Sequence, residues 1–177
     1  ASLTGHLVLS TLHTNSAVES ITRLLDMGLD PFNFADALLG VLAQRLARRL
    51  CPDCVTRKPG TEEAIAALAE EYCAGTALDP GRAVDAWTAD YGRNGKIALA
   101  GPVGCKECGG SGFRGRIALH ELLVVTPPVR HLMRTKSAAS DIVPVAMEEG
   151  MHTMKQDGIE KVLQGLTVLE QVRAVCT

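Results

Sequence analysis

Two pairs of cysteines are the residues of this chain whose spacing most directly predicts chemistry. Cys51 and Cys54 form one Cys-x-x-Cys pair, and Cys105 and Cys108 form the other. A tight turn of this kind aims two thiolates at one ion, and two such turns complete the tetrahedral four-sulfur shell of a structural zinc site. Because a closed shell leaves no position for water or a substrate, we expect the metal to stabilise the fold and not to perform catalysis.

The residues around the cysteines suit two metal-binding turns. Pro52 restricts the first turn, and Gly109 and Gly110 follow the second, where the backbone needs positive φ. The first pair comes directly after a helical pattern and the second precedes a strand pattern, so a metal would join a helix end to a strand start. The other cysteines, Cys73 and Cys176, lie on helical patterns and are expected to be ordinary buried thiols.

Two other interpretations of the cysteines are weaker. Disulfides are typical of secreted, cysteine-dense chains, whereas six cysteines without a signal peptide favour a reducing compartment. A thioredoxin-like redox motif needs one pair between a strand and a helix, which is a context that neither pair has. The 50 residues between Cys54 and Cys105 exceed the spacing of common zinc ribbons. We therefore expect this insertion to be looped out on the surface.

Composition limits the class of protein. The chain has 177 residues, 46% of them hydrophobic and 21% charged, with a formal net charge of −2, which is enough for one domain or for one and a small satellite. Near-neutral charge and 3% aromatic content argue against a general nucleic-acid binder. No stretch is long and apolar enough to span a membrane. The first residues contain neither Met nor a charged region, so we expect the chain to be cut from a longer one.

The first 50 residues predict one strand and two helices. Residues 7–12 are a short apolar run that predicts a buried strand. Ser16 and Glu19 form a capping box that opens a helix, and Gly28 ends it. A second helix is expected from Asp30-Pro31 to about residue 50. Its evidence is a series of apolar residues spaced four apart, namely Phe34, Leu38, Leu42, Leu46 and Leu50.

The rest of the chain predicts an acidic insertion followed by a helical layer. Residues 59–104 are acidic and rich in Gly and Pro, and they predict a helix over residues 61–73, a loop, and a short strand over residues 96–99, all facing solvent without chemistry. A strand is expected over residues 116–125. Helices are expected from Thr126-Pro127, near residues 140–149 and 153–164, and after a capping box formed by Thr167 and Glu170.

Several segments together carry a family resemblance. Residues 4–15 resemble the histidine box of the type II/type IV secretion ATPase superfamily. The resemblance continues through residues 23–28, 44–46, both cysteine pairs, 112–116 and 150–167. It covers essentially the whole chain outside residues 55–100, and the combination of motifs is highly specific.

The resemblance implies a fold and a division into parts. Such proteins are hexameric P-loop motors, so we expect the C-terminal half of a RecA-like α/β domain with an inserted tetracysteine zinc module and a helical C-terminal layer. Residues 1–50 would belong to the ATPase core, residues 51–112 to the metal-binding module, and residues 113–177 to a strand and a helical subdomain. The retraction motors of the superfamily generally lack the tetracysteine module, so its presence here points to the secretion or pilus-assembly branch.

The nucleotide-binding motifs of the family are missing from this chain. No Gly-x-x-x-x-Gly-Lys-Ser/Thr occurs, so the backbone cradle and the lysine for the phosphates are absent. The acidic Walker B segment, which in this family lies just before the histidine box, is absent too. We therefore expect ATP and Mg²⁺ to be cofactors of a parent chain and this fragment alone to be inactive.

The resemblance also assigns roles to individual residues. His6 and His13 flank the predicted strand, and in this family they would sense the γ-phosphate; from spacing alone, strand capping is the better interpretation. Thr4, Gly5 and Thr11 would be supporting positions. For Arg45, a place near the nucleotide or a subunit boundary is about as well supported as an exposed helical arginine.

The resulting prediction is part of an ATPase motor for type II protein secretion, coupled to pseudopilus assembly. Residues 120–123 resemble the secretion version of the family slightly more than the pilus version, so type IV pilus assembly is the alternative. An alternative of another class is a zinc-stabilised interaction module without a nucleotide role. The family's implied partners are a homo-hexamer and the cytoplasmic parts of an inner-membrane secretion platform. We therefore expect the protein to be cytoplasmic and attached to the inner membrane through its partners. We expect it to bind no nucleic acid and to have no membrane span of its own.

Overall fold

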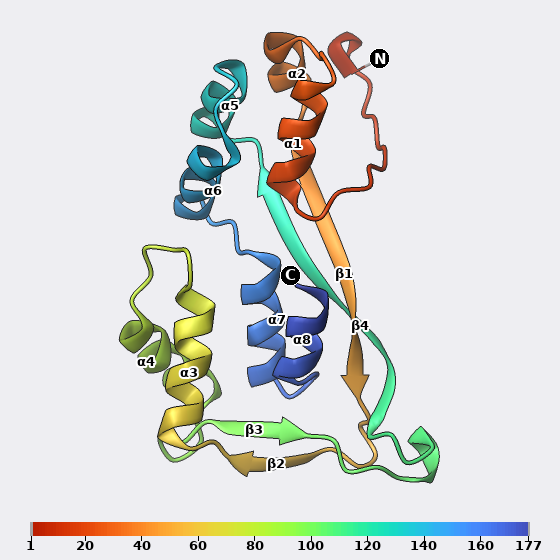
Figure 1. Cartoon of the computed structure of the whole chain (residues 1–177), viewed down its shortest axis with the longest axis vertical. Coiled ribbons are helices and arrows are strands. Elements are labelled where there is room, and N and C mark those ends of the chain that lie inside the picture. Colours follow the sequence, from red (N-terminus) through yellow and green to blue (C-terminus); the bar gives the residue numbers. More distant parts are fainter. Residues whose placement is uncertain (1, 177) are drawn as a thin grey trace. The chain divides into compact units, whose positions relative to one another are not determined.

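Two long strands, β1 (Gly40–Leu50) and β4 (Phe113–Val124), pair with each other in the computed structural model, which describes residues 2–176 (Figure 1). They run antiparallel, because the Val125 N–H donates to the Leu39 carbonyl at one end and the Cys51 N–H donates to the Gly112 carbonyl at the other. The chain divides into two compact units, and both strands contribute residues to each. Unit 1 holds the residues up to Gln44 and His120–Thr153, and unit 2 holds Arg45–Leu119 and the residues from Met154 onward.

The helix predicted from Asp30-Pro31 to residue 50 is wrong in its second half. Asp30 caps α2 (Pro31–Ala37) as expected, but the chain becomes extended at Leu38 and continues as β1. A spacing of four residues is also a multiple of two, so the same leucines fit one face of a strand. Pairing with β4 decides between the two structures, and the sequence pattern alone could not show that pairing.

The strand predicted over residues 7–12 is also wrong. After a short 3₁₀ helix, η1 (Ser2–Thr4), the segment has no regular structure, and the Leu9 side chain is 89% exposed. Among the described residues this segment joins no sheet. An apolar run forms a buried strand only when neighbouring strands supply hydrogen bonds and cover its side chains.

Unit 1 has its own hydrophobic core. It is formed by α1 (Ala17–Asp26), α2, α5 (Pro127–Arg134), α6 (Ala139–Glu148) and the unit 1 parts of β1 and β4. The predicted cap of α1 is confirmed, since the Ser16 Oγ accepts the Glu19 N–H at 3.1 Å, and Gly28 follows the helix with a φ of 92°. The buried residues are Ala17, Val18, Ile21, Leu25, Ala35, Leu123, Val125, Val129, Met133, Ile142, Ala146 and Met151.

Unit 2 contains the insertion and the last two helices. The ribbon of β2 (Thr56–Pro59) and β3 (Ala98–Gly101) is antiparallel, with Arg57 opposite Ala100. Between these strands lie α3 (Glu62–Cys73) and α4 (Pro80–Tyr91), and α7 (Met154–Leu163) and α8 (Leu169–Val175) complete the unit. The predicted start of α3 is confirmed, because the Thr61 Oγ1 accepts the Ala64 N–H.

The insertion is not looped out on the surface, as the sequence suggested. Trp87 of α4 and Leu68 of α3 are buried in one cluster with Ile159 and Leu163 of α7. The Tyr72 ring meets the Trp87 ring edge to face, with centroids 5.1 Å apart. The helix α4 occupies the predicted loop, and the insertion supplies most of the buried residues of this hydrophobic core.

One predicted helix cap is wrong as well. The helix α8 begins at Leu169, and the Thr167 hydroxyl does not cap it but donates to the Arg48 carbonyl at 2.8 Å. Thr167 is fully buried, so its hydroxyl needs a partner inside unit 2 and finds one on β1. No helix among residues 2–176 has the length and apolar character that crossing a membrane requires.

Candidate functional site

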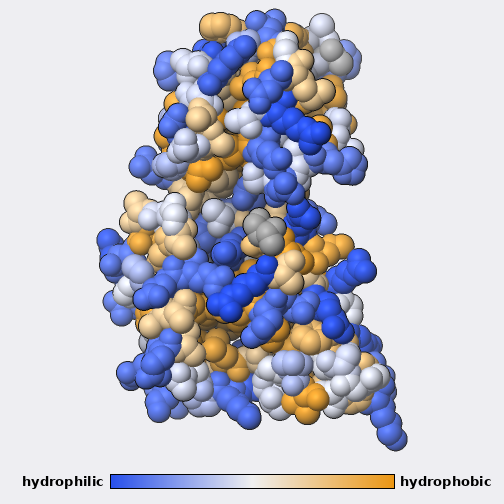
Figure 2. All heavy atoms as spheres, in the orientation of Figure 1, coloured by the Kyte–Doolittle hydropathy of each residue, from blue (hydrophilic) through white to orange (hydrophobic). Residues whose placement is uncertain are grey.

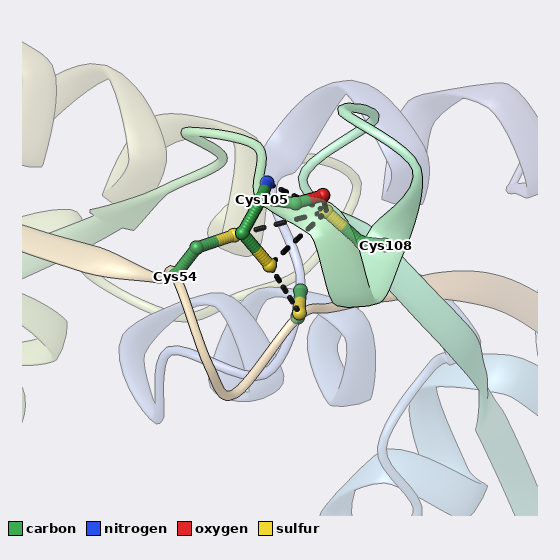
Figure 3. A group of neighbouring side chains, drawn as sticks. Cys54, Cys105 and Cys108 are labelled. Atoms are coloured by element: carbon green, nitrogen blue, oxygen red, sulfur yellow. Dashed lines mark hydrogen bonds between the residues drawn. The ribbon is translucent and has the colours of Figure 1, made fainter.

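The four predicted zinc ligands come together in unit 2. Cys51 directly follows β1, Cys54 precedes β2, and Cys105 and Cys108 lie at the 3₁₀ helix η2 (Lys106–Cys108). Their sulfurs all lie within 4.8 Å of one another, with Cys51 to Cys105 and Cys54 to Cys108 at 3.9 Å and Cys105 to Cys108 at 3.7 Å. Figure 3 shows the side chains of Cys54, Cys105 and Cys108 pointing toward one another.

This spacing fits a tetrahedral metal site. Four sulfurs at about 2.3 Å from a zinc ion lie about 3.8 Å from one another. The observed separations are close to that value, and all six cysteines are free thiols and not disulfides. The cluster could therefore hold a metal such as zinc. The site joins the C-terminal end of β1 to the segment that leads into β4. The element before the first pair is the strand β1 and not the predicted helix.

Backbone N–H groups are directed at two of the sulfurs. Gly104 donates to the Cys54 Sγ at 3.3 Å, and Cys105 and Gly112 each donate to the Cys108 Sγ at 3.1 Å. The Cys105 N–H is the main cause that lowers the pKa of the Cys108 thiol to about 6, because such donors stabilise the thiolate. Burial instead raises the pKa of the Cys51 thiol to about 12. A bound cation would stabilise the Cys51 thiolate and so offset the cost of burying its charge, as a metal ion does for the thiolate ligands of a closed site.

The turns after the second pair require glycine. Gly109 and Gly110 have φ values of 59° and 80°, which confirms the sequence prediction. Gly112 was not predicted to matter, but its φ is 74°, and a Cβ there would lie 3.0 Å from the Pro102 Cα. Its carbonyl also accepts the Cys51 N–H at 2.9 Å, so Gly112 binds both halves of the cluster.

A charged contact outside the sulfur shell links the two turns. Arg114 donates to the Asp53 Oδ2 at 2.8 Å and lies 3.9 Å from a Glu107 carboxylate oxygen. The Asp53 Oδ2 also lies 3.7 Å from the Cys51 Sγ. Sequence reasoning missed this contact, although Asp53 and Glu107 occupy the same position within their Cys-x-x-Cys pairs. That repeated acid, with an arginine shortly after the second pair, is the signal that could have revealed it.

The predicted histidine segment lies in unit 1 and is exposed. The Thr4 Oγ1 lies 3.2 Å from the His6 Nδ1, and Gly5 between them has a φ of 89°. The His13 carbonyl accepts a hydrogen bond from the Arg23 Nη1 at 2.7 Å. Thr11 lies in the irregular stretch between the two histidines. Arg45 is an exposed residue of β1 and belongs to unit 2, so it does not lie on a helix.

A buried acid that sequence reasoning missed lies where the histidine segment enters α1. Glu121 of β4 is 7% exposed, and its Oε1 accepts the Ala17 N–H at 2.7 Å. An anionic acceptor at a helix N-terminus is favourable because the first N–H groups have no partner within the helix. Its sequence signal is an acid within the apolar strand pattern of residues 116–125.

Comparison with known proteins identifies the family. The family described as "Type II/IV secretion system protein" matches residues 1–174. The chain is 44% identical to the type IV pilus assembly ATPase PilB of Thermus thermophilus over 98% of its own length and 17% of that protein. It is 43% identical to the type II secretion system protein E of Aeromonas hydrophila over 99% of its length and 30% of that protein. The type II secretion system ATPase E of Vibrio cholerae is 38% identical, with 99% and 30% covered.

The chain thus spans less than a third of the length of these curated relatives. The match nevertheless runs through both units and through all four clustered cysteines. On this evidence, the chain belongs to the type II/IV secretion system protein family.

Proposed function

We propose that this chain is the C-terminal portion of a RecA-like P-loop ATPase that powers type II protein secretion by driving pseudopilus assembly. The observation that carries the proposal is the match over 98–99% of the chain to proteins named as a type IV pilus assembly ATPase and a type II secretion system ATPase. In the proposed whole protein, ATP and Mg²⁺ bind to motifs outside this chain. The protein works as a homo-hexamer in the cytoplasm, docked on an inner-membrane secretion platform.

Exposed apolar side chains in unit 1 support the proposal that this chain is one part of a larger ATPase. Leu7, Leu9 and Leu42 are 76%, 89% and 58% exposed. The surface in Figure 2 has apolar residues among hydrophilic ones on the face in view. Exposed apolar side chains that gather in one part of a protein often mark a surface that contacts another part or partner. We propose that another part of the whole protein covers these side chains.

The four cysteines would hold one structural zinc ion. Cysteine sulfurs would occupy all four coordination positions of the ion, which leaves none for water or a substrate. The ion would therefore contribute to folding free energy and not to catalysis. Freshly purified chain should contain close to one equivalent of zinc, measured by mass spectrometry of the metal. Cys105→Ser should lose the metal, whereas Cys176→Ser, outside the cluster, should keep it. A chain that contains no zinc and keeps its fold in chelator would contradict the assignment.

The histidine segment would carry the response to nucleotide. We propose that His6 and His13 sense the γ-phosphate, that Thr4, Gly5 and Thr11 shape the segment around them, and that Arg45 lies near the nucleotide or a subunit boundary. The Thr4–His6 contact and the anchoring of Ala17 by Glu121 support this role, because both restrain parts of the segment.

A chimera tests the proposed function. This chain would replace the corresponding portion of the Aeromonas hydrophila type II secretion system protein E, and secretion by a strain that lacks the native protein would be measured. Restored secretion is the expected result. The Thermus thermophilus pilus-assembly ATPase offers the parallel test, because its 44% identity makes type IV pilus assembly the second candidate. Restored piliation without restored secretion would favour that candidate.

A further inference from the structure

A small basic pocket lies in unit 2, and its lining includes none of the four clustered cysteines. Its volume is about 290 Å³. It is formed by β2, by the C-terminal end of α4 with the turn that follows, and by the end of α7. The lining residues are Arg57, Asp90, Tyr91, Gly92, Arg93, Leu163 and Gln164.

The Arg57 guanidinium is held in place on one side of this pocket. Its Nη2 donates to the Gln164 carbonyl at the end of α7, where a cation complements the helix dipole. It also lies against Gly165, where a Cβ would come within 2.7 Å of the Arg57 Cζ. Gly165 has a φ of 75°, so its backbone conformation disfavours a larger residue, although the Arg57 guanidinium could move away from a Cβ. Only one of the five N–H donors of Arg57 is used in this contact, and a pre-positioned guanidinium loses little entropy when it binds an anion.

A tight turn fixes the backbone of Arg93 on the other side. Arg93 and Lys96 exchange two backbone hydrogen bonds of 2.9 and 3.1 Å, and the two residues between them have positive φ values of 52° and 71°. Those values are typical of the two-residue turns that close hairpins. Among the described residues, the Arg93 guanidinium forms no ion pair within 4.0 Å, although Asp90 lines the same pocket.

The remaining lining limits what the two arginines can receive. Leu163 is buried in the core of unit 2 and gives the pocket an apolar floor beside the half-buried Tyr91 ring. The Asp90 carboxylate would repel a dianion more strongly than a singly charged group. The volume is at the lower limit for small-molecule sites. These properties fit one carboxylate attached to a short apolar stem.

We propose that this pocket binds an aspartate or glutamate side chain presented by a partner protein. Two guanidinium groups match the planar carboxylate, and Leu163 and Tyr91 contact its methylene groups and apolar neighbours. The proposal goes beyond the ATPase role of the family and does not depend on it. The partner is defined by an exposed acidic residue with apolar residues beside it.

Amide NMR of the ¹⁵N-labelled 177-residue chain tests the pocket with a defined probe. The probe is the capped peptide acetyl-Leu-Glu-Leu-amide, and its matched control has Gln in place of Glu. The Glu peptide should bind with a dissociation constant of roughly a millimolar, which is typical of a single anchored side chain. It should shift the signals of Arg57, Arg93 and Gln164, and the shifts should weaken at high salt. Equal shifts with the Gln peptide would overturn the proposal.

Substitutions separate the pocket from general charge attraction. Arg93→Gln should weaken binding at least about tenfold, because a charge-assisted hydrogen bond is lost. The matched control is Arg82→Gln, which removes the same charge from an exposed position of α4 outside the pocket and should leave affinity unchanged. An unchanged spectrum elsewhere would show that Arg93→Gln still folds. Equal losses in both variants would overturn the proposal.

Two further measurements exclude other occupants. Inorganic phosphate that displaces the Glu peptide at lower concentration than the peptide's own dissociation constant would identify a phosphate site and contradict a carboxylate partner. Pocket signals that move on dilution of the chain alone would identify a second copy as the occupant and would also contradict it. Absence of both effects, with the selective losses above, is the expected result.

Discussion

Gly112 shows how one residue can control the whole cysteine cluster. Its N–H donates to the Cys108 Sγ, its carbonyl accepts the Cys51 N–H, and its backbone has positive φ. Any residue has the backbone groups for these two hydrogen bonds, but only glycine fits. A Cβ at this position would lie 3.0 Å from the Pro102 Cα and 3.1 Å from the Val103 nitrogen. The position therefore combines a conformational requirement with a steric one.

We expect Gly112→Ala to weaken metal retention and to destabilise unit 2 by about 2 kcal/mol or more, from backbone strain and overlap together. Zinc content and the midpoint of chemical unfolding measure the two effects. Gly101→Ala is the matched control, because Gly101 lies near the cluster on β3 with open space at its Cβ and no positive φ. Its zinc content and stability should stay near those of the parent chain. Similar behaviour of the two variants would show that Gly112 has no special role.

At the scale of elements, a cluster of ion pairs links α3 to α7 and α8. The Glu71 carboxylate receives two hydrogen bonds from Arg173 of α8, at 2.7 and 3.0 Å to Oε2, and lies 3.5 Å from the Lys155 Nζ of α7. Glu71 is only 17% exposed, so solvent screens it less than an ordinary surface acid. The hydrogen bonds from Arg173 lower the pKa of Glu71.

This lowered pKa gives a pH-dependent prediction. The folded state holds Glu71 ionised more strongly than the unfolded state, so its stabilisation is present above the unfolded pKa of about 4.5 and disappears as pH falls through the lower folded pKa. Glu71→Gln should cost about 1 kcal/mol at pH 7, because Arg173 is largely exposed. The difference from the parent should vanish in acid. Urea unfolding at several pH values measures it, and Glu70→Gln, on an exposed position of the same helix, should show little change at any pH.

Metal removal should loosen particular elements and not the whole chain. Cys54 is two residues before β2, and Cys105 is four residues after β3, so the cluster closes the base of that ribbon. Hydrogen exchange after chelation should become faster in β2, β3 and η2, because their restraint is lost. Exchange in α1 should stay unchanged, since α1 packs in the separate core of unit 1. Equal acceleration in α1 and β2 would contradict this.

The elements also show what sequence patterns could and could not predict. The caps at Ser16, Asp30 and Thr61 were predicted because they depend on neighbours within a few residues, and the cysteine cluster because each of its two Cys-x-x-Cys pairs is a local motif that needs a second pair. Residues 38–50 were predicted as helix because their apolar residues are spaced four apart. That prediction is wrong because pairing with β4, about 70 residues later in the sequence, decides their structure. The missed helix α4 had a signal of its own, since Asp79 caps it and accepts the Arg82 N–H at 2.9 Å. The Asp79-Pro80 pair repeats the Asp30-Pro31 signal, but Gly81 and the acidic surroundings favoured a loop.

At the scale of the whole molecule, the first question is whether this chain alone handles nucleotide. It contains no P-loop motif, and the exposed segment of His6 and His13 has no backbone cradle for phosphates in the sequence. We expect calorimetry with ATP and Mg²⁺ to show no binding at micromolar nucleotide. Turnover by this chain, after contaminating ATPase has been excluded by an independent purification, would contradict the proposed division of the ATPase.

The second question at this scale is what the histidines do in a complete motor. If the proposed function is right, the chimera with the Aeromonas hydrophila protein is a complete ATPase, in which His6→Ala and His13→Ala can be compared. A γ-phosphate sensor acts on the barrier, and we expect a loss of turnover of about tenfold or more, equivalent to about 1.4 kcal/mol. Because His6 and His13 are exposed in this structure, neither substitution removes a buried contact of unit 1.

Melting temperature and zinc content of the two chimeras therefore provide the control, and both should match those of the unsubstituted chimera. Thr22→Ala, at a half-buried position of α1 outside the histidine segment, is the control variant and should keep normal turnover. If the histidine variants instead melted early and kept normal turnover per folded molecule, the histidines would be structural residues at the entry to α1. The ratio of the loss in turnover to the loss in stability thus decides between a phosphate sensor and a cap, because only a sensor changes the first without the second.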